Sequence, residues 1–285
     1  MFFKKCENIL SVTKMMDLLI PLFGFLIGTV ASMIGVGGGV FIVPLLTLFY
    51  EFSPSQAVGT SLATIIFTSS ASTFNYARQK KIYYKTGAIL AMATVPGAYL
   101  GAYLTSVIEA WLLGLVFGVF LLFVALRMII KVRFSKLGQS NVKKSLDFAL
   151  IESENSLFES KRRVLTGAML SFFGGICSGL LGIGGGSLLV PIMVLAMNMQ
   201  IHATIATSMF TMIFTSISGV VEHSRLGNIS FGYVLLMVSG TILGAQLGAC
   251  TSGKISSHNL QKIFGVALVI ISIRMITKYA GAVFL

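Results

Sequence analysis

Apolar runs separated by short polar segments extend along almost the whole chain. Residues 18–34 and 89–107 are two such runs, and neither contains a charged residue. A helix needs about 20 mostly apolar residues to cross the ~30 Å hydrocarbon layer of a bilayer. The pattern therefore predicts an all-α polytopic membrane protein, with the lipid bilayer as its surroundings.

The composition agrees with this prediction and excludes an ordinary soluble domain. Hydrophobic residues make up 55% of the chain and charged residues 11%, whereas soluble domains carry about 25% charged residues. The net charge of +12 does not point to nucleic acid, because the basic residues form short clusters between apolar runs, as in cytoplasmic membrane loops. Cys6, Cys177 and Cys250 are too scattered for a disulfide or metal framework. Neither a metal nor a cofactor is expected.

The chain contains an internal repeat with a shift of 147 residues (182 − 35). The segment GVGGG at residues 35–39 recurs as GIGGG at residues 182–186, and the same shift aligns Pro44 with Pro191. About a third of the positions between residues 25 and 131 are identical in the second copy, and no gap is needed. An alignment of this length indicates a duplicated unit, as in many transporters.

Each copy is expected to contain about four transmembrane helices, of which the first is interrupted by the glycines. The first transmembrane repeat covers residues 1–131, a charged cytoplasmic linker covers 132–163, and the second repeat covers 164–285. The interrupted first helices lie near residues 16–50 and 164–197.

The distribution of lysine and arginine predicts the orientation, because cytoplasmic loops carry the excess of positive charge. Placing both termini and the linker in the cytoplasm puts nearly all basic clusters on that side of a cell inner membrane. An even number of crossings in each copy then makes the two copies parallel. If residues 38–50 instead cross as a separate helix, the copies are inverted. Whether the protein forms a homo-oligomer stays open.

The glycine segments are the first candidate for binding a small anion. Three glycines in a row interrupt a helix, and in hydrocarbon such a break survives only against protein or a water-filled cavity. The bare N–H groups and the positive end of the next helix then bind anions. In the alternative interpretation, the glycines only allow close helix packing. The candidate substrate-binding residues here are Gly35, Gly37, Gly38, Gly39, Gly182, Gly184, Gly185, Gly186 and Ser187.

Hydroxyl residues at about four-residue spacing form a polar stripe on one face of the next predicted helix in each copy. A hydroxyl can donate to an anion without placing a full charge in the membrane. It can equally bond a neighbouring helix, which stabilises packing by about 0.6–2 kcal/mol. Both interpretations stay open. The candidate residues are Thr60, Ser61, Thr64, Thr207, Ser208 and Thr211.

Charged residues inside membrane spans indicate function by default. Glu222 and His223 lie near the end of their predicted span, and Asn75 aligns with Glu222 in the first copy. These three residues are candidates for a gate or for proton coupling, and an interfacial ion cluster is the alternative. No catalytic residue is expected.

The motifs GVGGGVFIVPLL and GIGGGSLLVPIM, each followed by a Thr-Ser pair, resemble the sulfite exporter TauE/SafE family, which is also grouped with the toluene-sulfonate uptake permeases. The resemblance covers both copies. It implies a bacterial-type inner-membrane permease, not an enzyme, with duplicated four-span halves. Such a secondary transporter would move sulfite, a sulfonate, thiosulfate or a related small anion.

Two other functions remain as alternatives. A passive anion channel would use the same residues as a carrier. An intramembrane hydrolase would need Ser187 as nucleophile within hydrogen-bond reach of His202 or His223, but Ser187 aligns with Val40 in the first copy.

Overall fold

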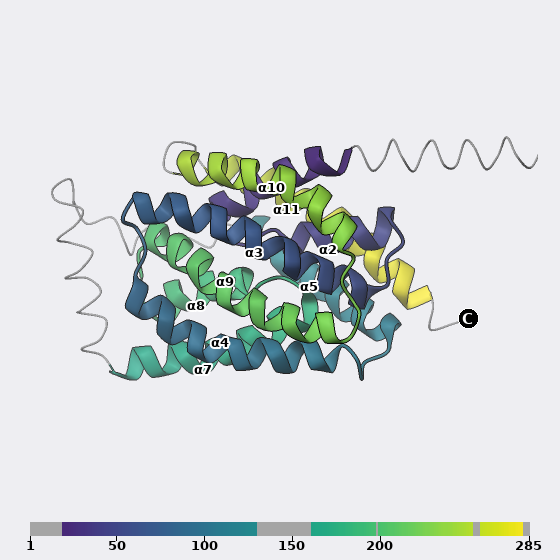
Figure 1. The fold of residues 1–285 in the computed structure, drawn as a ribbon, viewed down its shortest axis with the longest axis horizontal. Helices are drawn as coiled ribbons and strands as arrows, with labels where there is room; N and C mark the ends of the chain where they lie inside the picture. Colours follow the sequence, from purple (N-terminus) through teal and green to yellow (C-terminus); the bar gives the residue numbers. More distant parts are fainter. Residues whose placement is uncertain (1–18, 130–160, 198, 253–256, 282–285) are drawn as a thin grey trace, which may run out of the picture.

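A computed structural model describes residues 19–129, 161–197, 199–252 and 257–281. Every regular element in these ranges is an α-helix (Figure 1), so the predicted all-α class is confirmed. Most of the charged linker, residues 132–160, lies outside the described residues. The helices are Leu19–Ile34, α2 (Gly39–Phe49), α3 (Pro54–Arg78), α4 (Tyr84–Leu104), α5 (Ala110–Ile129), α7 (Lys161–Leu181), α8 (Gly186–Leu195), α9 (Ile201–Arg225), α10 (Phe231–Thr251) and α11 (Ser257–Gly281).

The bundle has an apolar outer surface and an apolar core that also contains many hydroxyl residues. Hydroxyl residues such as Thr60 and Thr64 are fully buried, whereas Phe123, Leu235 and Ile270 are more than half exposed. Within the described ranges, 6 helices are long and apolar enough to cross a membrane. Exposed apolar side chains over so much of the surface suit a bundle surrounded by lipid.

The two copies interlock, because helices of one copy pack alongside helices of the other. Thr60 near the start of α3 accepts a hydrogen bond from the N–H of Ser230, just before α10 (3.1 Å). Gln79, directly after α3, donates to the carbonyl of Ala249 near the end of α10 (3.1 Å). α3 and α10 therefore run in the same direction. α4 runs alongside α9 in the same way (Figure 1).

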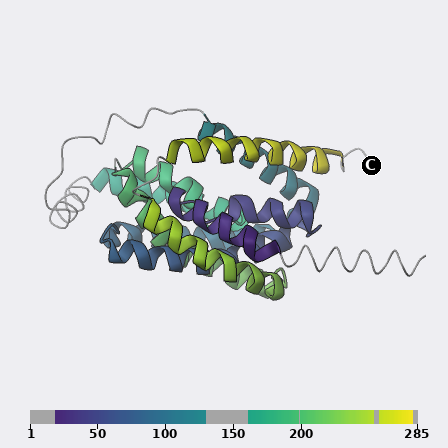
Figure 2. The same ribbon diagram turned by 90° about the horizontal axis from the view of Figure 1, so that it is seen from above.

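Equivalent helices of the two copies run in opposite directions. A Cβ on Gly59, near the start of α3, would lie 3.1 Å from the Cβ of His223, near the end of α9. α5 and α11 are likewise antiparallel and form a pair on one side of the bundle (Figure 2). A two-fold axis that relates antiparallel spans lies in the membrane plane. The copies therefore form an inverted repeat.

The interrupted segment causes this inversion, because its two helices form a re-entrant hairpin. The first helix runs alongside α10, with Pro21 against Gly240 and Thr29 against Gly248. α2 then runs back in the opposite direction and ends beside α11, where the Nζ of Lys278 donates to the carbonyl of Thr47 (2.7 Å). The hairpin adds no net crossing, so three helices cross in each copy: α3, α4 and α5 in the first, and α9, α10 and α11 in the second. Of the two alternatives that the sequence left open, the hairpin therefore favours inverted copies over the parallel copies that the charge bias indicated.

The apices of the two hairpins, which we call the first turn (residues 35–38) and the second turn (residues 182–185), lie in direct backbone contact. The Cα of Gly39 faces the carbonyl of Gly182 so closely that a Cβ has no space there. Gly186 meets the carbonyl of Gly35 in the same way. The duplicated sequence thus produces a duplicated contact, with glycine required on both sides of it.

Two serines hold the turns in place across the copies. Ser61 on α3 donates to the carbonyl of Gly182 (2.8 Å), and Ser208 on α9 donates to the carbonyl of Gly35 (3.2 Å). The two bonds are related by the same 147-residue shift (208 − 61). Each turn is therefore held by a helix of the other copy.

The inverted arrangement also separates the ends of the chain from the linker. The first helix begins and α11 ends at one end of the bundle, which we call the terminal end (Figure 1). α5 ends and α7 begins at the opposite end, the linker end. The expectation that the termini and the linker share one side is therefore wrong. Most of the 21 lysines and arginines belong to the linker end, including Arg78, Lys81 and Lys85. The charge bias now favours a cytoplasmic linker and external termini.

A cysteine-accessibility experiment tests this topology. In a background in which Cys6, Cys177 and Cys250 are replaced by serine, a single cysteine is placed either at Ser140 in the linker or at Val107 between α4 and α5. We expect an impermeant thiol reagent to label V107C in intact cells and S140C only in inverted vesicles. Labelling of both positions from the same side would contradict the inverted repeat.

Substitution of a contact glycine tests the packing of the two turns. Gly39→Ala pushes a methyl group into the carbonyl of Gly182, and overpacking of this kind destabilises a protein by about 1–3 kcal/mol. We expect a lower melting temperature for the purified protein and loss of flux. Gly232→Ala on α10 is the matched control, because a Cβ there meets nothing within 4 Å. Equal melting temperatures for the two variants would show that the turns do not touch.

Candidate functional site

The two turns have the same backbone conformation. Gly35, Gly37 and Gly38 have φ of 83°, 78° and 99°, and the corresponding glycines of the second turn have φ of 69°, 70° and 87°. Residues with a Cβ rarely adopt this left-handed conformation. The candidate glycines are thus brought together at the centre of the bundle, and the reversal of the chain depends on them.

Each turn ends at the start of a helix that has free N–H donors. Gly38 and Gly185 are the N-cap residues of α2 and α8, and neither has a side chain that could accept a hydrogen bond. Within the described ranges, no acceptor is found for the N–H groups of these two glycines. The positive end of the helix dipole lies at the same place. Buried donors at a helix start are the arrangement that binds anions in many proteins.

The space directly between the turns is occupied. Besides the backbone contact, the side chains of Ile65 and Met212 lie against Gly37 and Gly184. Both side chains are fully buried. An anion site midway between the turns is therefore not formed in this structure, and a site would have to lie on the flank of one turn.

Most hydroxyls of the polar stripe already make hydrogen bonds to backbone groups. Thr64 and Thr211 donate to the carbonyls four residues earlier in their own helices, at 3.0 Å in both cases. Thr60 and Thr207 accept from backbone N–H groups that precede α10 and α4. With Ser61 and Ser208 bonded to the turns, the stripe supports helix packing and the position of the turns. A role of these hydroxyls in substrate binding stays a prediction.

Ser187, in the first turn of α8, has a buried hydroxyl without a hydrogen-bond partner among the described residues. His223 is oriented elsewhere: its Nε2 lies 3.3 Å from the carbonyl of Gly179 and its Nδ1 lies 3.5 Å from Asn228. No bond joins Ser187 to His202 either, within the part of the chain that is described. The geometry does not form the nucleophile–base pair that a hydrolase needs.

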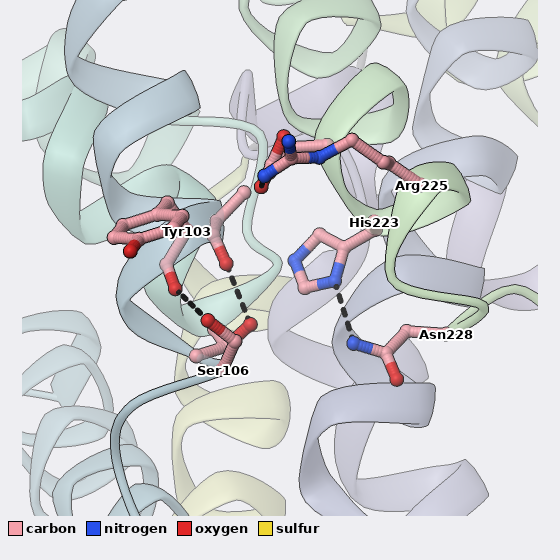
Figure 3. A network of polar contacts seen from close by, with 8 residues as sticks. Tyr103, Ser106, His223, Arg225 and Asn228 are labelled. Carbon is pink, nitrogen blue, oxygen red and sulfur yellow. Dashed lines mark hydrogen bonds and ion pairs between the residues drawn. The ribbon is translucent and has the colours of Figure 1, made fainter.

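Glu222 and His223 lie near the end of α9, at the terminal end of the bundle. Figure 3 shows His223 and Arg225 there, together with Tyr103 near the end of α4. The side chains of Glu222 and His223 are both fully buried. The Nη2 of Arg225 lies 2.6 Å from the Oε1 of Glu222, and the arginine side chain is 62% exposed. The Oε2 of Glu222 has no partner among the described residues. The cluster is therefore a buried carboxylate that is paired on one side with an exposed cation.

Asn75, the counterpart of Glu222, lies at the opposite end of the bundle. Its Nδ2 is 3.4 Å from the carbonyl of Gln246, so it contacts α10 and carries no charge. The structure does not bring Asn75 together with Glu222 and His223. The three residues therefore do not form one cluster in this structure, and their roles in gating or coupling stay predictions.

The sequence analysis did not recognise the role of Tyr76, the counterpart of His223. Tyr76 donates to the carbonyl of Ser32 (2.9 Å), and His223 contacts the carbonyl of Gly179, which is the equivalent position in the second copy. Each residue ties α3 or α9 to the helix that leads into a turn. The 147-residue shift that aligns the two residues was the signal from which this pairing could have been predicted.

The sequence analysis also did not single out Ser178 as a site residue. Its buried hydroxyl has no partner among the described residues, and it lies against the second turn. The first copy has Ala31 at this position. The alignment of Ser178 with an alanine was the available signal.

Comparison with known proteins places the chain in a family. The sequence profile of the family described as "Sulfite exporter TauE/SafE" matches residues 20–275. The chain is 32% identical over 265 residues to "Probable membrane transporter protein YunE" of Bacillus subtilis (strain 168), which covers 90% of this chain and 96% of that protein.

More distant relatives extend over similar lengths. "Probable membrane transporter protein MJ0441" of Methanocaldococcus jannaschii is 27% identical over 91% of this chain and 96% of its own. No solved structure matches the chain significantly. The family match covers both turns and all the helices between them. The chain is a membrane transporter that belongs to the sulfite exporter TauE/SafE family.

Proposed function

We propose that this transporter is a secondary carrier for a small sulfur oxyanion, such as sulfite, thiosulfate or a sulfonate. The single observation that carries the proposal is the pair of re-entrant hairpins whose helices α2 and α8 begin, with free N–H groups, at the centre of the bundle. Oxyanions accept several hydrogen bonds at once, and neutral donors hold them without a permanent buried charge. Binding of this kind is weak enough to be reversed on the other side of the membrane.

The burial of the turns favours a carrier over a passive channel. All residues from 35 to 39 and from 182 to 186 are buried. An anion therefore reaches the free N–H groups only after the helices move. In transporters built from inverted repeats, the two copies exchange conformations and expose a central site to either side in turn. Equivalent helices that run in opposite directions provide the symmetry for that exchange.

A reconstituted flux assay tests the proposal. Purified protein in liposomes is screened with labelled sulfite, thiosulfate, sulfate, a sulfonate and a small carboxylate. We expect saturable uptake of at least one sulfur oxyanion, accelerated by the same anion on the opposite side. Flux that rises linearly with concentration and shows no exchange would indicate a channel. A preference for the carboxylate would contradict the proposed substrate class.

The direction of transport depends on the membrane potential and on coupling. Moving one elementary charge across the membrane changes the free energy by about 2.3 kcal/mol per 100 mV. With a negative cell interior, export of an anion is assisted, whereas import needs a coupled ion. Among the described residues, Glu222 is the buried carboxylate, and His223 is its neighbour. We therefore place proton coupling, if the protein imports its substrate, at this pair.

Substitution at the pair tests the coupling. We expect Glu222→Gln or His223→Ala to abolish accumulation driven by a pH gradient and to preserve counterflow exchange, because the anion site lies elsewhere. Tyr76→Ala is the matched control, since it removes the equivalent helix contact and leaves the carboxylate intact. Accumulation at the wild-type level in both variants would show that the pair is a structural ion cluster. If Tyr76→Ala loses as much of the accumulation driven by a pH gradient, the helix contact explains the loss and proton transfer at the pair does not.

A further inference from the structure

The two turns share a backbone conformation but differ in the side chains around them. Two fully buried serines lie against the second turn. The Oγ of Ser216 on α9 is 3.1 Å from the point where a Cβ of Gly184 would stand, and the Oγ of Ser178 on α7 is 3.6 Å from the same point at Gly185. Both side chains have 0% exposure, and neither hydroxyl has a partner among the described residues. A buried hydroxyl without a partner costs about 1–3 kcal/mol, so its presence calls for an explanation.

Ser187 is a third serine next to the second turn. It is the second residue of α8, and its buried Oγ also lacks a partner within the described ranges. It follows Gly185, the N-cap residue, by two positions. The second turn is therefore accompanied by three unpaired hydroxyls and by the N-terminus of a 10-residue helix.

The first turn lacks unpaired hydroxyls of this kind. Ala31 and Val40 replace Ser178 and Ser187. Ser69, the counterpart of Ser216, is present, but its hydroxyl donates to the carbonyl of Ile65 (2.6 Å). The flank of the first turn is apolar, with Ile27 within 3.1 Å and Ala31 within 3.5 Å of a Cβ position on Gly38. An anion at the first turn would find the N–H groups but no unpaired hydroxyl, because Ser208 already donates to the carbonyl of Gly35.

We infer that the substrate anion binds at the second turn alone, where the hydroxyls of Ser178, Ser187 and Ser216 and the N–H groups at the start of α8 donate to its oxygens. The inference rests on the proposed function and specifies its site. The ligand is a small oxyanion with several acceptor oxygens, and each chain binds one. The first turn has a similar backbone conformation but apolar flanks. It supports the second turn by direct contact and does not bind the anion.

Kinetics of the proteoliposome assay test this site, with labelled thiosulfate and sulfite as probes. A lost hydrogen bond to a charged ligand weakens affinity by about tenfold or more. We expect S178A, S187A and S216A each to raise the apparent KM by about tenfold. Two matched controls are S69A, whose hydroxyl is already bonded, and S171A, which removes another buried hydroxyl without a partner on the same helix as Ser178. We expect both controls to stay within about twofold of the wild type. Calorimetry with thiosulfate should give one bound anion per chain.

The possible outcomes distinguish an error in the inferred site from an error in the proposed function. Saturable transport by the wild type, with the three variants indistinguishable from the controls, would overturn the site and leave the proposed function standing. Two bound anions per chain would also overturn it, because the first turn would then bind as well. Absence of saturable flux of both probes in the wild type would contradict the proposed function, and the inferred site with it. If a serine variant unfolds, the corresponding threonine variant, which keeps the hydroxyl, should restore the affinity.

Discussion

Backbone contact between the two glycine turns is the constraint on which the rest of the structure depends. The turns touch through Gly39 and Gly186, which meet the carbonyls of the opposite turn with no space for a side chain. In a membrane interior, unpaired backbone groups are tolerated only where protein or a cavity covers them. Each turn covers the other, and Ser61 and Ser208 satisfy one carbonyl in each. The helices that follow begin at the centre of the bundle because this contact is possible.

The same contact requires the copies to be inverted and interlocked. Two re-entrant hairpins can meet apex to apex only if they enter from opposite ends. The flanking helices then pack against the other copy, as α4 does against α7 and the first helix against α10, through glycines at successive turns. Neither copy buries its own hairpin alone. The duplicated halves are therefore repeats in sequence but not separate domains in space.

Much of this architecture could be predicted from the sequence, and the failures have physical causes. The all-α class and the position of the helix breaks followed from hydrophobicity and from the glycine clusters. The direction of the chain after the break did not, because a glycine segment permits either a continued helix or a reversal. That one ambiguity changed the number of crossings and, with it, the relation between the copies and the side of the termini.

The sequence predicted both glycine turns, and their role in substrate binding stays a prediction. Glycine motifs identified the turns, since few other residues accept a positive φ at consecutive positions. The threonine stripe had two equally good interpretations, and only its bonds to backbone groups favour the structural one. Ser178 lies outside the motif, and its proximity to Gly185 depends on how α7 and α8 fold back on each other. Such contacts are set by tertiary packing, which a single sequence does not reveal.

The location of a bound anion is the most direct test of the central claim, which is that a glycine turn at the start of a re-entrant helix binds the substrate. Selenite, the selenium analogue of sulfite, can be located by its anomalous scattering in crystals of the protein. The account predicts a selenium peak beside the start of α8, with the selenite oxygens within hydrogen-bond distance of the N–H groups there. Selenium bound at the basic loops, with none beside either turn, would contradict it.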